Sequence, residues 1–255
     1  MTVGKNSWSI LKWLHISLQF SDGPKQKEHD VIEMFELGAD IITGTEAGED
    51  VLWNLIVKYA EEFGYRVKRY RSNFICIKKE IIKRGSWTSG GVTVEDKEKV
   101  FGPGHDSAFP WVGFTHRTPG IGEIFIAAGH YPTKGRRPGD PNYLVNKKYA
   151  GKVSDWAVEK GKGTALAFYA GDQNMPDDRS DTFFGGPLTS IWDELGKHQN
   201  TGHGNIDIVA SYNHDGRVTA LSVRACNDRE WFMHSDHFPV IARYRIKHLE
   251  DKPTI

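Results

Sequence analysis

Cysteine is scarce in this 255-residue chain, and neither sign of charge is in excess. The two cysteines, Cys76 and Cys226, fit neither a disulfide framework nor a zinc cluster by their spacing, which favours a reducing compartment. The 33 basic residues balance 33 acidic ones, so no overall field draws the chain to nucleic acid or to an anionic membrane. Any binding of a polyanion must therefore come from local basic patches.

Long hydrophobic runs are also absent. The apolar residues at 10–14 are interrupted by Lys12 and followed by His15, so we expect neither a signal peptide nor a membrane-spanning segment. No repeat, low-complexity tract or long linker divides the chain, and its composition of 38% hydrophobic and 26% charged residues is that of a globular protein. We therefore predict one domain over 1–255, cytoplasmic and monomeric, with no membrane partner.

Apolar periodicity predicts many strands and few helices. Helical spacing of apolar residues predicts helices at 24–37, 49–63 and 142–160. Strand-like runs, most of them bounded by Gly, Pro or Asn, are expected at 8–18, 41–46, 65–71, 74–78, 108–117, 123–128, 165–170, 206–211, 218–223 and 238–246. This pattern favours a layered α/β architecture of two packed sheets over a doubly wound parallel sheet.

Polar side chains that bind metals or move protons stand at the ends of several strand-like runs, or within one of them. Burying such groups without partners is costly, so their concentration against apolar strands indicates a functional site. The candidate residues are Glu46, His130, Asp172, Asn174, Asp207, Asp236 and His237.

Each member of this set has a simpler interpretation when it is taken alone. Glu46 fits an exposed glutamate at a strand end, Asn174 fits a turn residue, and His130 fits a structural histidine. Asp207 lies inside an apolar strand and needs a buried partner, for which a histidine is suitable. The complete set is far more specific than any one residue.

The order of these residues resembles the endonuclease/exonuclease/phosphatase superfamily, typified by deoxyribonuclease I and exonuclease III. The strongest motifs are Gly-Asp-Gln-Asn at 171–174 and Ser-Asp-His-Phe-Pro-Val at 235–240, and the resemblance runs from the first strand to Tyr244. It implies an α/β, four-layer α-β-β-α sandwich of two packed, mainly antiparallel sheets. It also implies metal-dependent hydrolysis of a phosphoester at a rim where strand ends and loops converge.

The resemblance implies a metal ligand at Glu46 and an acidic residue near the metal at Asp236. Oxygen ligands favour a hard cation, so the expected cofactor is Mg²⁺ or Mn²⁺. At the position of an asparagine that usually ends the family's first strand, this chain has Ser17, with Gln19 two residues on. Serine can still hydrogen-bond a metal-bound water.

The resemblance also implies the catalytic roles. Asp172 matches the aspartate that contacts or activates the attacking water, and Asn174 matches the asparagine that orients the water or the phosphate. His237 matches the histidine that contacts the phosphate, and Asp207 matches the carboxylate that holds this histidine. His130 resembles the deoxyribonuclease-type histidine that contacts the phosphate or assists the leaving group.

Local basic segments favour a nucleic-acid substrate. The range 66–84 holds eight Lys or Arg residues against one acid, with aromatic residues interleaved, although a solvated hairpin explains it equally well. The loop after His130 is the better candidate because it follows a site residue directly. The candidate substrate-binding residues are Ser17, Arg117, Lys134, Arg136 and Arg137, with Arg117 the weakest.

Three functions follow as hypotheses. The first is an endo- or exonuclease that hydrolyses DNA or RNA phosphodiester bonds. The second is a phosphomonoesterase acting on a small phosphorylated molecule or a lipid head group, which the neutral net charge favours slightly, although the Asn-Ile-Asp at 205–207 departs from the Trp-Cys-Asp-Arg motif of inositol phosphatases. The third is a catalytically weakened nucleic-acid or phosphate-binding module, which only Ser17 supports.

Overall fold

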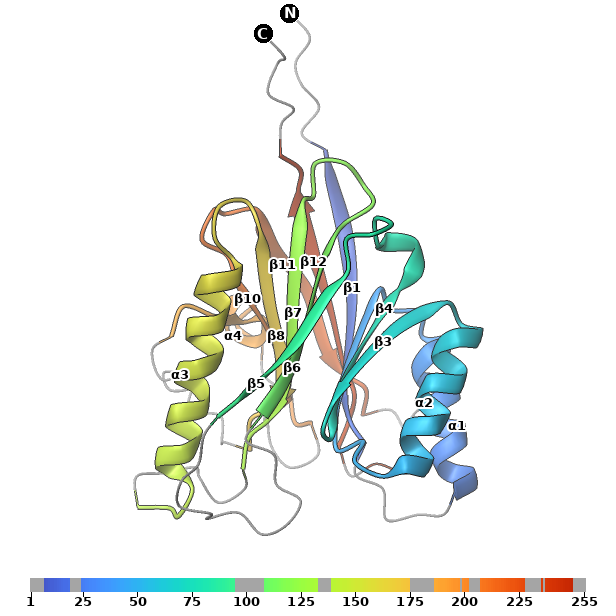
Figure 1. The fold of residues 1–255 in the computed structure, drawn as a ribbon. Helices are drawn as coiled ribbons and strands as arrows, with labels where there is room; N and C mark the ends of the chain where they lie inside the picture. The colour runs from blue at the N-terminus through green and yellow to red at the C-terminus, as the bar shows by residue number, and fades with distance from the viewer. Residues whose placement is uncertain are drawn as a thin grey trace, which may run out of the picture.

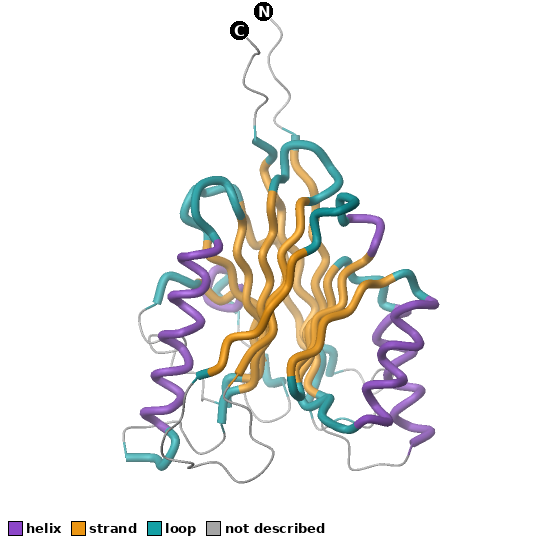
Figure 2. Tube along the Cα trace, viewed as in Figure 1, coloured by secondary structure: helices purple, strands orange, loops and turns teal. Residues whose placement is uncertain are grey.

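Two six-stranded sheets pack face to face, and helices pack against part of each outer surface (Figures 1 and 2). The computed structural model describes residues 7–18, 24–94, 108–132, 139–174, 186–197, 199–201, 207–227, 235 and 237–249.

The first sheet joins strands from both ends of the chain. Its members are β1 (Trp8–Ser17), β2 (Ile41–Thr45), β3 (Tyr65–Tyr70), β4 (Asn73–Lys78), β11 (Val218–Ala225) and β12 (Val240–Lys247). Their spatial order is β11-β12-β1-β2-β4-β3. Strands β1 and β2 are parallel and are connected by helix α1 (Pro24–Glu36), whereas the other neighbouring pairs are antiparallel.

The second sheet is built from the middle of the chain. Its members are β5 (Thr88–Thr93), β6 (Ala108–Thr115), β7 (Glu123–His130), β8 (Leu166–Asp172), β9 (Thr189–Ser190) and β10 (Asp207–Tyr212). Their spatial order is β5-β6-β7-β8-β10-β9. Here β7 and β8 are the parallel pair, connected by helix α3 (Tyr143–Lys160), and the other neighbours are antiparallel.

The main core lies between the two sheets. Alternate residues of β1, such as Leu11 and Trp13, are buried there, because successive side chains of a strand point to opposite faces. The Trp13 ring lies 5.6 Å from that of Phe168 on β8, and the Phe168 ring lies 5.3 Å from that of Tyr244 on β12. These contacts join the sheets directly, with no helix between them.

Helices complete the outer layers. Helices α1 and α2 (Asp50–Glu62) pack on the outer face of the first sheet through a second apolar cluster, and α3 packs on the second sheet. The fold is therefore the predicted α-β-β-α sandwich of mainly antiparallel sheets (Figure 2). No helix in the described part of the chain combines the length and the apolar character needed to cross a membrane.

The structure contains elements that the periodicity does not predict. Strand β5 reads Thr-Ser-Gly-Gly-Val-Thr and lacks apolar alternation. It forms because Gly90 and Gly91 leave room for two aromatic rings, since a Cβ atom at either position would lie 2.7 Å from Trp111 or Tyr70. The two-residue strand β9, the 3-10 helix η1 (Lys79–Ile81) and the four-residue helix α4 (Ile191–Glu194) are too short for a periodic signal.

Candidate active site

Six strand ends meet at one edge of the sandwich, the lower edge in Figure 1. Strands β1, β2, β7 and β8 end there, and β10 and β12 begin there. This is because the strands of the two parallel pairs run toward this edge, whereas their antiparallel neighbours β10 and β12 run away from it. Most of the candidate residues with a described position lie at this edge. The topology therefore brings together residues that are far apart in the sequence.

The second sheet contributes a row of three residues. His130 pairs in register with Asp172 on β8, and Asp172 pairs with Asp207 on β10. Directly paired residues on neighbouring strands project from the same face of a sheet, so the three side chains gather into one group. His130 Nε2 lies 3.5 Å from Asp172 Oδ2.

Asp172 is a buried carboxyl group with a raised pKa. Only 2% of its surface is exposed, and its Oδ1 accepts a 2.8 Å hydrogen bond from the backbone N–H of Asn174. Burial, followed by the charge of Asp207, raises the pKa of Asp172 to about 7, although His130 and His237 oppose the rise. This carboxyl group can therefore take up or release a proton near neutral pH.

His237 and Asp207 form a buried hydrogen-bonded pair. His237 Nδ1 donates to Asp207 Oδ2 over 2.8 Å, and His237 Nε2 lies 3.8 Å from Asp172 Oδ2. Burial raises the pKa of Asp207, but contacts with His15 and His237 outweigh burial and hold it below its usual range. The ionised Asp207 thus keeps the hydrogen on Nδ1 and leaves Nε2 facing Asp172.

Strand β1 adds a second histidine to Asp207. His15 is fully buried, with Nε2 3.5 Å from Asp207 Oδ1 and Nδ1 3.1 Å from Thr43 Oγ1. In the sequence, His15 stands out only as the residue that ends an apolar run. Its spacing of two residues from Ser17 places both on one face of β1, and this was the signal that could have identified it.

Glu46 and Ser17 approach from the first sheet. Ser17 Oγ donates to Glu46 Oε2 over 2.9 Å, and Glu46 Oε1 lies 3.9 Å from His130 Nδ1. The Ser17 backbone carbonyl also accepts a 2.7 Å hydrogen bond from Ser235 Oγ, just before His237. Ser17 therefore links Glu46 at the rim to the segment that carries His237.

Asn174 orients His130. Its Nδ2 donates to Tyr131 O over 2.7 Å and to His130 Nε2 over 2.8 Å, which leaves the hydrogen of a neutral His130 on Nδ1, toward Glu46. Glu46 and Asn174 have positive φ values of 62° and 47°, and among the described non-glycine residues only Arg71 shares this conformation. Such backbone conformations cost energy and are concentrated at functional sites.

Not every predicted residue reaches this edge. Arg117 follows β6, which ends beside Glu123 at the start of β7, so it lies roughly 23 Å of strand length from His130. Its backbone N–H donates to Ile81 O over 2.7 Å, at the opposite end of the sandwich. The prediction that Arg117 belongs to the site is therefore wrong. Strand β6 runs antiparallel to β7, so it ends at the edge of the sheet opposite His130. Four other predicted residues lie outside the described residues: Lys134, Arg136, Arg137 and Asp236.

The site has a donor set that suits a hard cation. Ligand atoms of Asp172, Asp207 and His237 lie within 4.8 Å of one another, and all three residues are buried. Asp207 Oδ2 is already engaged by His237 Nδ1, so an ion here would first meet Asp172 and His237 Nε2. A cation would offset the repulsion between two buried carboxylates, and Glu46, whose side chain is 23% exposed, offers a further oxygen ligand.

Comparison with known proteins gives matches among solved structures. Neither a protein-family model nor a curated protein matches the chain. An endonuclease/exonuclease/phosphatase family protein from Bacteroides thetaiotaomicron has a TM-score of 0.69 and 16% identity over 97% of this chain and 100% of its own. D. rerio TDP2 complexed with single strand DNA product has a TM-score of 0.68 and 13% identity over 92% and 99%.

A mannosyl-6-phosphatase from Bacteroides thetaiotaomicron has a TM-score of 0.66 and 17% identity, covering 92% of this chain and 99% of its own. These likenesses extend over nearly the whole of each chain, although the sequence identities are low. The chain therefore has the endonuclease/exonuclease/phosphatase fold, as the resemblance of its motifs predicted.

Proposed function

We propose that this chain is a metal-dependent phosphodiesterase, namely a nuclease that hydrolyses DNA or RNA by attack of an activated water. The observation that carries the proposal is the buried Asp172, with a pKa near 7, facing Nε2 of a histidine held by Asp207. This is the arrangement needed to move a proton beside a phosphate in a site shielded from water.

In this mechanism Asp172 takes a proton from the attacking water, and Asn174 keeps Asp172 and His130 in place through its two hydrogen-bonding groups. His237 Nε2 donates a hydrogen bond to a phosphate oxygen. Asp207 stabilises the protonated imidazole from the opposite side of the ring. Each role uses a polar atom whose position is set by a hydrogen bond in the described part of the site.

A divalent cation, Mg²⁺ or Mn²⁺, would neutralise charge on the phosphate when bound. Glu46 is the proposed ligand from the first sheet, with Ser17 fixing its carboxylate, and Asp236 is a proposed neighbour of the ion. Phosphate contacts by Lys134, Arg136 and Arg137 stay predictions from the sequence. These four residues lie outside the described residues, and each can be tested by substitution.

His15 is proposed as a positioning residue. With His237 on Oδ2 and His15 facing Oδ1, the Asp207 carboxylate is held from two sides. A carboxylate held from both sides restricts the orientation of the His237 imidazole more than a carboxylate held by a single hydrogen bond does.

The direct test is metal-dependent cleavage by the purified chain. Plasmid DNA, single-stranded DNA and RNA are each incubated with Mg²⁺ or Mn²⁺, with His237→Ala as the inactive control. We expect one or more of these polymers to be cut by the wild type and left intact by the variant. If all three remained uncut with either ion, the nuclease proposal would be abandoned.

A phosphomonoesterase is the second candidate. It is favoured by the mannosyl-6-phosphatase that shares this fold over nearly its whole length. Release of inorganic phosphate from phosphosugars or inositol phosphates, with nucleic acid untouched, would support it. The third candidate, a weakened binding module, would be supported by indistinguishable activity of the wild type and Asp172→Ala in both assays.

A further inference from the structure

Three adjacent strands of the first sheet carry positive charge only. Strands β11, β12 and β1 contain no aspartate or glutamate, although the chain has 33 acidic residues elsewhere. Their five cations form what we term the basic face: Lys12, Arg224, Arg243, Arg245 and Lys247. A chain with no net charge thus concentrates one sign of charge on three neighbouring strands.

The basic face is the outer surface of this part of the sheet. Lys12 pairs in register with Arg243, and Ile10 pairs with Arg245. The residues between them, such as Trp13 and Tyr244, are buried in the core, so the cations point away from it. Helices α1 and α2 pack over the side of the sheet that β2, β4 and β3 form and bury Ile241, but they leave the cations of β11 and β12 exposed.

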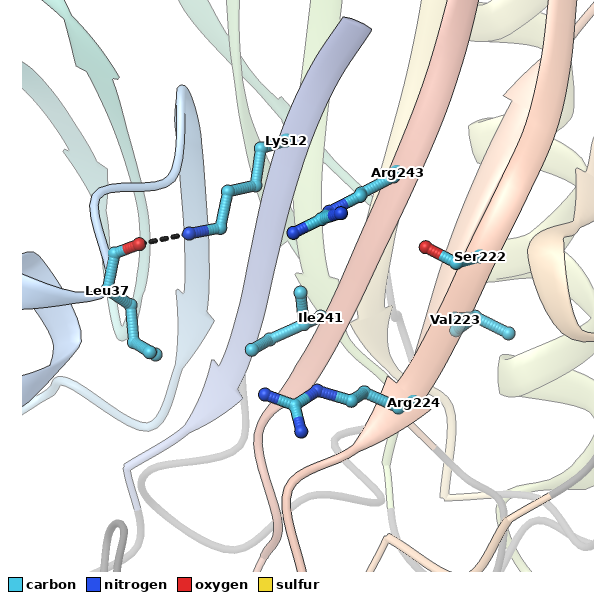
Figure 3. A pocket seen from close by; sticks show the side chains of 7 residues that line it. All are labelled: Lys12, Leu37, Ser222, Val223, Arg224, Ile241 and Arg243. Atoms are coloured by element: carbon cyan, nitrogen blue, oxygen red, sulfur yellow. Dashed lines mark hydrogen bonds between the residues drawn. The ribbon is translucent and has the colours of Figure 1, made fainter.

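A groove of about 300 Å³ crosses the basic face. Ile241 lies in its centre and Leu37 at one side, while Lys12, Arg224 and Arg243 supply three cationic groups (Figure 3). Figure 3 shows the guanidinium groups of both arginines extending toward the β1 side of the groove. The groove therefore joins cations from three different strands.

The described residues place few acids near these cations. Within the described part of the chain, no carboxylate oxygen lies within 4.0 Å of Arg224, Arg243, Arg245 or Lys247. Burial, followed by the charges of Arg243 and Lys78, lowers the pKa of Lys12, and Asp40 opposes this only in part. The groove is thus a region of positive potential in which an anion would relieve repulsion.

We propose that the basic face binds the phosphate groups of a single-stranded polynucleotide. Arg243, Arg245 and Lys247 recur every second residue of β12, about 6.8 Å apart, a spacing similar to that of successive phosphates in an extended strand. Trp8, which is 57% exposed, pairs in register with Lys247 and offers a ring on which a base can stack. Cations in a row beside an exposed aromatic ring are the usual elements of a single-strand site.

The basic face is distinct from the candidate active site. Lys12 lies five residues before Ser17 on β1, about 17 Å along the strand, and points to the other side of the sheet. Arg224, level with Ile241 and through it with Leu14, lies nearer that edge, about 10 Å from Ser17 along the strand. The basic face would therefore bind a polymer on the outer side of the sheet, and this binding requires no hydrolysis. The inference shares its ligand class with the proposed nuclease function, and the two can fail separately.

The test is binding of a fluorescently labelled oligo-dT to the full chain by anisotropy, in EDTA so that no metal-dependent cleavage occurs. We expect Arg224→Gln/Arg243→Gln to bind on the order of tenfold more weakly. The slope of log affinity against log salt should also fall by about 1.4, or 0.7 for each lost phosphate contact. Trp8→Ala should weaken binding at least about fivefold with no change in this slope.

The matched control is Lys147→Gln/Lys152→Gln, which removes two exposed cations from α3 on the second sheet. Circular dichroism checks that both double variants are folded. Equal affinity of the wild type and the Arg224/Arg243 variant would overturn the inference, as would equal losses in both double variants.

Two further outcomes separate the alternatives. Loss of oligo-dT binding in the Arg224/Arg243 variant, in a protein that cuts no nucleic acid, would support the inference and reject the nuclease function. Binding to phosphatidylserine vesicles without any binding to oligo-dT would reject the inference in favour of a membrane surface.

Discussion

The two sheets contribute to the candidate site in different ways. The second sheet supplies His130, Asp172 and Asp207 from regular, paired strand positions, with both aspartates almost fully buried. The first sheet supplies Glu46 from beyond the end of β2, with a positive φ and a partly exposed carboxylate. Burial within paired strands therefore shifts the pKa of a carboxyl group, whereas a residue beyond a strand end at the rim keeps its carboxylate partly exposed and able to bind a metal ion.

The largest effect is expected from a substitution in the buried row of His130, Asp172 and Asp207. Asp172→Asn keeps the oxygen that accepts from the Asn174 backbone but removes the proton acceptor, so cleavage should slow by about 10²- to 10⁴-fold. Initial rates with Mg²⁺ on the preferred substrate provide the measurement, and Asp155→Asn on the exposed face of α3 is the control. A variant with near-wild-type rate would show that Asp172 is not the base.

The next effect tests the rim. Glu46→Gln removes a charged oxygen ligand but leaves the buried row intact, so half-maximal activity should require roughly 10- to 100-fold more metal. Titration of activity with Mg²⁺ measures this shift, and the maximal rate should be largely recovered at saturation. An unchanged metal dependence would place the ion elsewhere, for example between Asp172 and His237.

A smaller effect is expected from substitution of His15, which connects β1 of the first sheet to Asp207 of the second. His15→Phe leaves Asp207 Oδ1 without its facing imidazole, so kcat should fall roughly tenfold while KM is little changed. His15→Gln restores a polar group toward Asp207 and should recover part of the loss, which a purely structural role would not predict. Steady-state kinetics of both variants, with thermal unfolding as a check on folding, distinguish the two roles.

The smallest effect concerns stability. The pKa of Asp172 is raised to about 7 from an ordinary value of 3.8, so ionisation destabilises the folded state as pH rises through that interval. Asp172→Asn avoids this cost and should be more stable than the wild type by roughly 1 to 4 kcal/mol at pH 8. Thermal unfolding in EDTA at several pH values should show the difference disappearing by about pH 4.

Much of the fold was predictable because its signals are local. The helices at 24–37, 49–63 and 142–160 match α1, α2 and α3 within a few residues, since their apolar faces repeat over several turns. Strand β5 was missed because it relies on Trp111 and Tyr70, which pack over two glycines and leave no alternation in its own sequence.

In the candidate site, too, some residues could be predicted from local sequence and others could not. Asp172, Asn174 and His237 could be predicted as candidates because each follows or precedes a buried strand within a recognisable motif, and the structure places them close together. Arg117 was misplaced because a strand-end arginine carries no sign of which edge of the sheet it reaches. His15 was overlooked because its partner, Asp207, belongs to the other sheet.

By itself, the sequence determined which residue types stand at the strand ends and which elements form. The spacing of hydrophobic residues, and the polar or glycine residues that end each run, are local signals that extend over a few residues. Only the tertiary structure decided that His15 meets Asp207, that Asp172 acquires a pKa near 7, and that five cations form one face. These properties depend on strand direction, register and burial. Those quantities arise only when segments far apart in the chain pack together and exclude water.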